Sequence, residues 1–240
     1  MFAPAKLNFG IDAPGLVRGF AIAGPVLFAL GIALAGRGGL AGTFSPSLQG
    51  TGFGFTVSAV LMTLSSLYGK RLVARRLIAS LKLRGDERVL DVGCGRGLLL
   101  IEAARALPDG RATGIDLWSV RDQSGNAAAA TRANAAAAGV RARVDIDTGD
   151  MRKLPYADAS FDAIVSSLAI HNVSDAAERA NAVREIARAV KRGGRIALVD
   201  FKDTALYARV LRDAGFADVR RGWPNLLMFP PVRRVEARRP

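Results

Sequence analysis

Three glycines stand at alternate positions, 93, 95 and 97, directly after an apolar run in the segment VLDVGCGRG, Val89 to Gly97. Glycine adopts a positive φ without strain and lets a ligand approach the main chain closely. Where such a turn leads from a strand into a helix, free backbone N–H groups point at whatever binds there. The segment therefore predicts a binding site for a nucleotide-like molecule.

Two carboxylates accompany this turn. Asp91 ends the strand that precedes it, where it can accept a hydrogen bond from a cationic amino group or orient the turn. Asp116 ends the next predicted strand, 19 residues after Gly97, a place from which an acid can bond both ribose hydroxyls. The spacing G-x-G-x-G differs from the dinucleotide pattern, and the absence of Gly-Lys-Ser/Thr excludes a P-loop. A ligand with an amino-acid end, a ribose and little negative charge fits this arrangement better than a pyrophosphate does.

The single histidine, His171, follows the fourth predicted strand. Histidine titrates near neutral pH and suits a general base that reaches the proton of a nucleophile; the alternative is a loop histidine bonded to the backbone. The single cysteine, Cys94, lies inside the glycine turn, where we expect a structural role. One cysteine excludes an internal disulfide and a Cys-rich metal site, and no metal is expected. Asp200 ends the fifth strand and either faces a substrate or bonds to the chain after it.

The elements that position these residues alternate between strand and helix from Lys70 onward. This alternation predicts an α/β fold with a doubly wound, mostly parallel sheet, in which ligands lie beyond the carboxyl ends of the strands. The glycine turn stands at such an end. The predicted strands are 88–93, 111–116, 141–150, 161–170, 195–201 and two within 216–236, and the predicted helices are 70–81, 97–107, 126–139, 175–190 and 204–215.

Residues 1–69 have a different composition, with only four charges, whereas most of the net charge of +13 falls on residues 70–240. Residues 19–36 form one uncharged run, about 27 Å long as a helix and close to the ~30 Å of a bilayer core. A second run extends from 38 to 69, and its later part, 53–69, is the better candidate span. Between them, GTFSPSLQGTG at 42–52 predicts a turn-rich loop.

The charges that flank these runs predict their orientation. Lys6 and Arg18 precede the first run, a basic cluster at 70–76 follows the second, and Arg37 alone lies between. The positive-inside rule then predicts a membrane hairpin at 1–69 with both ends in the cytoplasm and a catalytic domain at 70–240 on the cytoplasmic side. Two alternatives stay open, a secretory signal peptide ending near ALAG at 33–36 or two buried helices of a soluble protein. The basic charge suits an anionic membrane better than nucleic acid, because no basic stripe with interleaved aromatic residues occurs.

Four blocks together resemble a known family: VLDVGCGRG, GID, TGDMRKLPYADASFDAIVSSLAIHNV and VKRGGRIALVDF. Their order and spacing are similar to those of class I S-adenosylmethionine-dependent methyltransferases, in the branch of the quinone-biosynthesis enzymes, over roughly residues 80–201. The resemblance implies a seven-stranded, Rossmann-like fold and S-adenosylmethionine as cofactor. It implies that the methionine portion is held by Asp91, Gly93, Cys94, Gly95 and Gly97, the ribose by Asp116 with Leu117, and the adenine by Asp150 with Met151, and that Ser167 lies near the sulfonium.

The sequence departs from the family in two places. After Asp116, the segment LWSVRDQSGN replaces a short helix start, so that Asp122, Gln123 and Asn126 either add cofactor contacts or cap the next helix. After the fifth strand only KDT precedes the next helix, where larger relatives place a substrate lid, so we expect an open substrate face toward the bilayer.

The function expected is a membrane-associated methyltransferase for a small, lipid-like or quinone-like acceptor. The alternatives are a soluble methyltransferase for a polar metabolite and a scaffold that binds the cofactor without turnover. In-line methyl transfer draws much of its rate from positioning, so the base is optional. Trp118 and Trp223 are expected to pack in the core or an interface, with adenine or lipid as the alternative partners.

Overall fold

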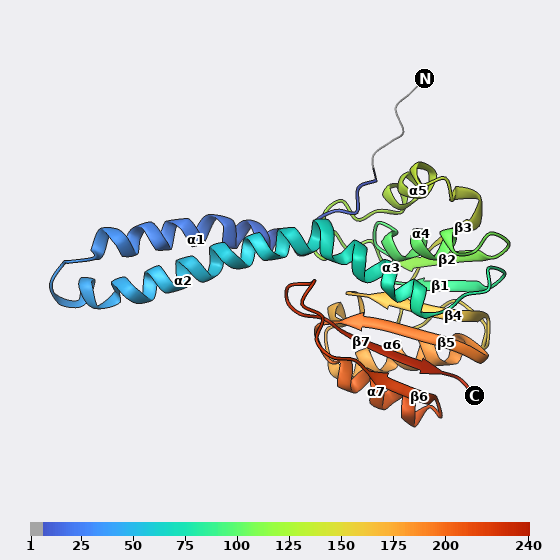
Figure 1. Ribbon diagram of the computed structural model, residues 1–240. Helices are drawn as coiled ribbons and strands as arrows, with labels where there is room; N and C mark the ends of the chain where they lie inside the picture. Colours follow the sequence, from blue (N-terminus) through green and yellow to red (C-terminus); the bar gives the residue numbers. More distant parts are fainter. Residues whose placement is uncertain (1–6) are drawn as a thin grey trace, which may run out of the picture.

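The computed structural model describes residues 7–240, so Lys6, one flank of the predicted hairpin, lies outside it. A seven-stranded sheet in the order β3-β2-β1-β4-β5-β7-β6 forms the centre of the domain (Figure 1). β1 to β5 are parallel, and β7 is antiparallel to both neighbours. The predicted doubly wound, mostly parallel sheet is confirmed. The strands are β1 (Arg88–Val92), β2 (Arg111–Asp116), β3 (Val144–Thr148), β4 (Phe161–Ser167), β5 (Val190–Asp200), β6 (Ala217–Arg221) and β7 (Arg233–Arg238).

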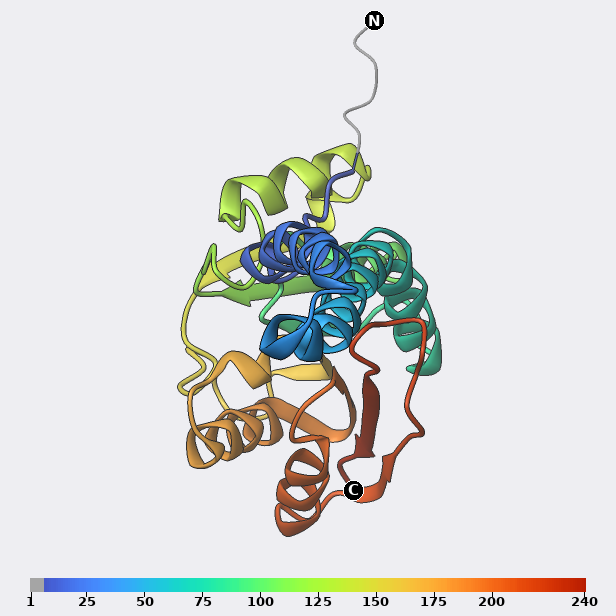
Figure 2. The ribbon, with the colours of Figure 1, turned by 90° about the vertical axis from the view of Figure 1, so that its left-hand side faces the viewer.

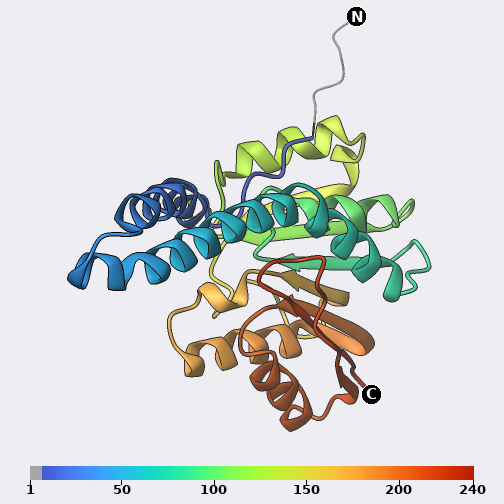
Figure 3. The same cartoon turned by 60° about the vertical axis from the view of Figure 1, so that its left-hand side comes forward.

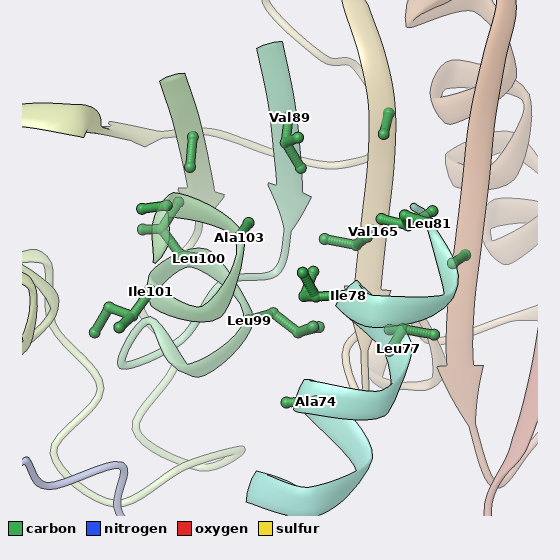
Figure 4. Close-up of a cluster of buried hydrophobic side chains, with 14 of the residues drawn as sticks. Ala74, Leu77, Ile78, Leu81, Val89, Leu99, Leu100, Ile101, Ala103 and Val165 are labelled. Atoms are coloured by element: carbon green, nitrogen blue, oxygen red, sulfur yellow. The ribbon is translucent and has the colours of Figure 1, made fainter. Parts of the chain in front are cut away.

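Helices cover both faces of the sheet. Successive strand residues point to opposite sides, and the apolar side chains on each side need to be buried. In β1, Val89 belongs to the apolar cluster with α3 (Lys70–Ser80) and α4 (Leu98–Arg105), whereas Leu90 belongs to the cluster with α6 (Ala176–Ala189) and α7 (Thr204–Asp213). Figure 4 shows Leu77 and Ile78 of α3 beside Leu99 of α4 in the first cluster. The domain helices are α3 (Lys70–Ser80), α4 (Leu98–Arg105), α5 (Ala128–Ala137), α6 (Ala176–Ala189) and α7 (Thr204–Asp213), with short helices η2 (Arg141–Arg143) and η3 (Ile170–Asn172).

The chain leaves α6 and enters β5 directly at Val190, five residues before the predicted start of that strand. The glycines predicted to separate the two elements lie inside β5, where Gly193 has a φ of 75° and the register with β4 shifts. Gly193 N donates to Arg239 O (2.8 Å) and Arg239 N donates to Gly194 O (3.0 Å). The predicted cap of α6 is confirmed, since Asp175 accepts a hydrogen bond from Glu178 N.

Two apolar helices, α1 (Pro14–Leu34) and α2 (Gly39–Leu64), project side by side from the carboxyl edge of the sheet (Figures 1 and 3). α2 continues through a π-helical turn, η1 (Ser65–Gly69), into α3, so the predicted boundary after residue 69 falls inside one continuous helical run. By length and composition, α1 and the run Gly39–Ser80 are both able to cross a membrane.

The predicted loop over residues 42–52 is wrong, because this segment lies inside α2. Ser45 Oγ donates to Gly31 O of α1 (2.8 Å). A Cβ placed on Gly31 would lie only 2.7 Å from Gln49 Cγ. The small residues that favour turns in water here let two helix backbones approach each other, as they do in membrane helix pairs.

Candidate active site

The glycine turn between β1 and α4 opens into a cavity of about 810 Å³ at the carboxyl edge of the sheet. Gly93, Gly95 and Gly97 have φ of 72°, 51° and 83°, the left-handed region in which side chains are strained. Gly93 N and Cys94 N both donate to Ile115 O of β2, at 2.8 and 3.1 Å. The turn is therefore fastened to the neighbouring strand with its backbone facing the cavity.

The structure brings the predicted site residues together, with one exception. Gly97 is not part of the cavity wall; it precedes α4, and a Cβ there would meet Thr131 Cγ2 at 2.8 Å. The absence of a side chain at Gly97 allows the backbone to lie close to Thr131 of α5. The predicted residues that line the cavity are Asp91, Gly93, Cys94, Gly95, Asp116, Leu117, Asp150, Met151, Ser167 and His171.

Asp91 is one of three described side chains in this wall with a buried atom that lacks a hydrogen-bond partner, together with Asn126 and His171. Its side chain is buried, and Oδ2 has no hydrogen-bond partner. Burial, with a smaller contribution from the nearby charge of Asp116, raises the pKa of Asp91 to about 8. A buried carboxyl group without a partner is unfavourable unless a ligand completes it. A cationic amino group placed against Oδ2 would do so.

Asp116 is held in place by its surroundings. Oδ2 accepts from Gly95 N (2.8 Å), and Oδ1 accepts from Trp118 N (2.6 Å) and Asn126 Nδ2 (3.2 Å). Because each carboxylate oxygen has two lone pairs, Oδ2 can accept one more donor, such as a hydroxyl group. Asn126 therefore supports Asp116. Gln123 supports the glycine turn, because its Oε1 accepts from Arg96 N (2.9 Å). Both residues do more than cap α5.

Two other predicted residues have constrained chemistry. Burial, reinforced by Asp91 and Asp116, raises the pKa of the Cys94 thiol, which agrees with a structural role and not with a nucleophile. The Asp150 carboxylate is engaged by Arg152, with Nη2 2.6 Å from Oδ2, and this hydrogen bond lowers the pKa of Asp150. The contact of Asp150 with an adenine stays a prediction.

His171 and Asp200 form a pair at the other side of the cavity. Nδ1 of His171 lies 2.8 Å from Oδ1 of Asp200, and the His171 backbone N donates to Oδ2 (3.1 Å). Asp200 also accepts from Phe201 N (2.8 Å) and from the Tyr207 hydroxyl group (3.2 Å), so it is buried and fixed. Nδ1 itself makes no hydrogen bond among the described residues, so Asp200 holds His171 by the backbone N and places a negative charge beside the ring.

The segment before α1 is the part of the site that sequence reasoning missed. Lys70 Nζ is buried and donates to Phe9 O, Gly10 O and Asp12 Oδ1, at 2.9, 2.9 and 3.0 Å. Asp12 also accepts from Gln123 Nε2 (3.3 Å), which ties the segment to the glycine turn. The sequence contained a signal for this contact: Asp12 is the single acid in the apolar residues 1–69, and such an acid usually has a charged partner.

Part of the cavity wall is apolar and comes from segments far apart in the sequence. It includes Leu16 and Phe20 of α1, Met62 of α2, and Phe229 and Pro230 of the β6–β7 loop. They line the cavity together with Phe201, which directly follows β5. The cavity therefore runs from the glycine turn to the base of the two apolar helices.

Comparisons with known proteins agree with this geometry. The sequence model of the methyltransferase domain family matches residues 89–194. The 27-O-demethylrifamycin SV methyltransferase of Amycolatopsis mediterranei is 37% identical over 52% of this chain and 43% of its own length. The ubiquinone/menaquinone biosynthesis C-methyltransferase of Geotalea daltonii is 30% identical over 53% of this chain and 51% of its own length. The chain spans about half the length of these curated relatives.

Residues 89–194 form a methyltransferase domain, in a chain with the fold of S-adenosylmethionine-dependent methyltransferases. A solved S-adenosylmethionine-dependent methyltransferase from Aquifex aeolicus shares its fold, with a TM-score of 0.53 and 19% identity over 68% of this chain and 88% of that one. The cofactor of this enzyme domain is S-adenosylmethionine. The residues present fit this cofactor. The unpartnered Oδ2 of Asp91 can accept from its ammonium group, and the free lone pair of Asp116 Oδ2 can accept from a ribose hydroxyl group. The glycine turn has no side chains that would prevent the cofactor from approaching the backbone.

Proposed function

We propose that this methyltransferase is anchored in a membrane and methylates a small, lipid-like or quinone-like acceptor. The observation that carries the proposal is the single cavity that joins the glycine turn to the base of α1 and α2. A cofactor at the glycine turn and an acceptor among Phe20, Met62 and Phe229 would share that cavity. The relative from Geotalea daltonii, by its name, acts in quinone biosynthesis, which agrees with an apolar acceptor.

The membrane part of the proposal rests on the outer surface of the helix pair. α1 has 21 residues and α2 has 26, about 32 and 39 Å as helices, enough for a bilayer core of ~30 Å. Large apolar side chains of both helices, among them Ile22, Val26 and Phe53, are exposed. In water such a surface is unfavourable, whereas in lipid it is the expected one.

In the proposed reaction, bound S-adenosylmethionine supplies a methyl group on a sulfonium. Asp91 and the glycine turn hold its amino-acid end, and Asp116 holds its ribose. His171 takes the proton of the acceptor, and the Asp200 carboxylate, 2.8 Å from Nδ1, stabilises the charged ring that forms. A positioned base of this kind contributes roughly 10²–10⁴ in rate.

The topology is tested by cysteine labelling in intact cells. Cys94 is buried, so the native chain gives a low background with a maleimide that does not cross membranes. Arg37→Cys, between α1 and α2, should react from outside the cell. Arg209→Cys, exposed on α7, should react only after lysis. Equal protection of both positions in intact cells would contradict a hairpin that crosses the membrane.

The activity is tested with methyl-labelled S-adenosylmethionine and two extracts of the same cells. The proposal expects label in the organic-solvent extract of membranes, and Asp91→Asn should abolish it. Label confined to the aqueous metabolites would instead support a soluble acceptor. Binding of S-adenosylhomocysteine without label in either extract would support the scaffold alternative.

A further inference from the structure

The exposed large apolar side chains of the methyltransferase domain are confined to one side. Among residues 7–240, and outside α1 and α2, they occur only in residues 65–72 at the base of the helix pair and in loops at the carboxyl edge of the sheet. The amino edge and the outer faces of α4 to α7 have none in the part of the chain described. The carboxyl-edge side chains are Leu117, Val120, Phe201, Trp223, Leu226 and Leu227.

The β6–β7 loop carries the most exposed of them, Trp223 at 90% and Leu226 at 80%. Because β7 is antiparallel to β5 and β6, this loop must lie at the same edge as the glycine turn. Hydrogen bonds between Asn225 and Val232, at 2.7 and 3.3 Å, close the loop. Ser65 Oγ of η1 donates to Phe229 O (3.4 Å), so the loop is also attached to the helix pair (Figure 2). It is a fixed structure that presents two large apolar side chains away from the protein.

Exposed cations accompany these side chains on the same side. Arg18 lies in the second turn of α1, Arg121 in the β2–α5 loop, Lys202 after β5 and Arg221 at the end of β6. None of the four forms a salt bridge with a residue that the structure describes. Basic side chains of this kind are attracted to anionic lipid headgroups, and Trp is the residue most typical of the interface itself.

We propose that the carboxyl-edge loops rest on the anionic leaflet that α1 and α2 enter, with Trp223 and Leu226 inserted at the headgroup level. The inference rests on the proposed membrane hairpin. The helix pair projects from this edge (Figures 1 and 3), so a bilayer that it crosses must face these loops. The part of the cavity that Phe20 of α1 and Phe229 of the loop line then lies next to the leaflet, and an apolar acceptor enters laterally without crossing water.

The experiment uses the full chain reconstituted into vesicles of phosphatidylethanolamine and phosphatidylglycerol that contain nitroxide-labelled lipids. Trp118→Phe leaves Trp223 as the single tryptophan. Its emission should shift to the blue on reconstitution and be quenched more by a nitroxide near the headgroup than by one near the chain terminus. A matched control in a Trp118→Phe/Trp223→Phe background is Arg192→Trp, exposed at the amino edge, which should not be quenched.

A third reporter, Phe28→Trp in the same background, separates the two proposals. Phe28 is an exposed residue of α1, and the hairpin predicts quenching by the deep nitroxide. If Phe28→Trp is quenched and Trp223 is not, the leaflet contact is overturned while the hairpin stands. If Phe28→Trp is not quenched, both fall. Protection of Trp223 from lipid nitroxides and from aqueous iodide alike would show that protein covers the loop, and would also overturn the inference.

Discussion

Binding of the cofactor should remove a proton from Asp91. Burial raises the pKa of this carboxyl group to about 8, so in the free protein at pH 7 it is neutral in roughly nine molecules of ten. The ammonium group of S-adenosylhomocysteine favours the ionised form. Binding at pH 7 should therefore release about 0.9 proton, and the affinity should rise about 50-fold between pH 6 and pH 8, the range in which deprotonation becomes easier.

Calorimetric titration in phosphate and in Tris at pH 7 measures this proton, because the observed enthalpy varies with the ionisation enthalpy of the buffer. Asp91→Asn should bind weakly and show no buffer dependence. His171→Gln is the control and should show the same buffer dependence as the native protein. Equal enthalpies in both buffers and a constant affinity from pH 6 to pH 8, in folded native protein, would refute the assignment of Asp91 to the ammonium group.

The same pKa shift that serves cofactor binding lowers the stability of the cofactor-free protein. The folded protein holds a proton on Asp91 that the unfolded chain loses above pH ~4, so the stability of the cofactor-free protein should fall as pH rises from 4 to 8. The contribution reaches roughly 4 kcal/mol by pH 7. Asp91→Asn should therefore raise the apparent melting temperature of the cofactor-free protein at pH 7, although it impairs binding.

Three further substitutions test the remaining parts of the site and the helix pair. His171→Gln should lower kcat by roughly 10²-fold or more on the acceptor identified in the extract assay, with unchanged binding of S-adenosylhomocysteine by calorimetry. Gly97→Ala, at φ 83° and close to Thr131, should destabilise the domain by about 1–3 kcal/mol in thermal melting, and by more than Gly139→Ala, at φ 71° with free space. Gly52→Leu would place its side chain against the backbone of α1 and should lower the yield of folded protein from membranes, whereas Gly54→Leu, with nothing within 4 Å, should not.

The sequence predicted the sheet well because its signals are local. Most of the parallel strands are short apolar runs followed by a turn and a helix. Asp116 ends β2, and Asp91 is the last residue but one of β1. Most of the residues that line the cofactor end of the cavity could also be predicted, because the carboxyl ends of parallel strands meet at one edge of the sheet.

The parts that could not be predicted depend on contacts between distant residues. Ser45 and Gly52 favour a turn by composition, and only the close approach of α1 makes that segment a helix. The bond from Gln123 to Asp12 spans 111 residues. The pairing of His171 with Asp200 needs β4 and β5 to be neighbours, which no local pattern states.

Lys70 links the helix pair to the cofactor site. It follows the π-helical turn, a feature that often occurs at functional sites because it changes which side chains point inward. Here Lys70 and Ser66 both contact Asp12, whose carboxylate also accepts from Gln123, and Gln123 accepts from Arg96 N in the glycine turn. A buried lysine with three oxygen partners tolerates little displacement, because an unpaired charge in that place is strongly unfavourable. The helices that we propose to lie in the bilayer and the turn that holds the cofactor are therefore positioned by one set of hydrogen bonds.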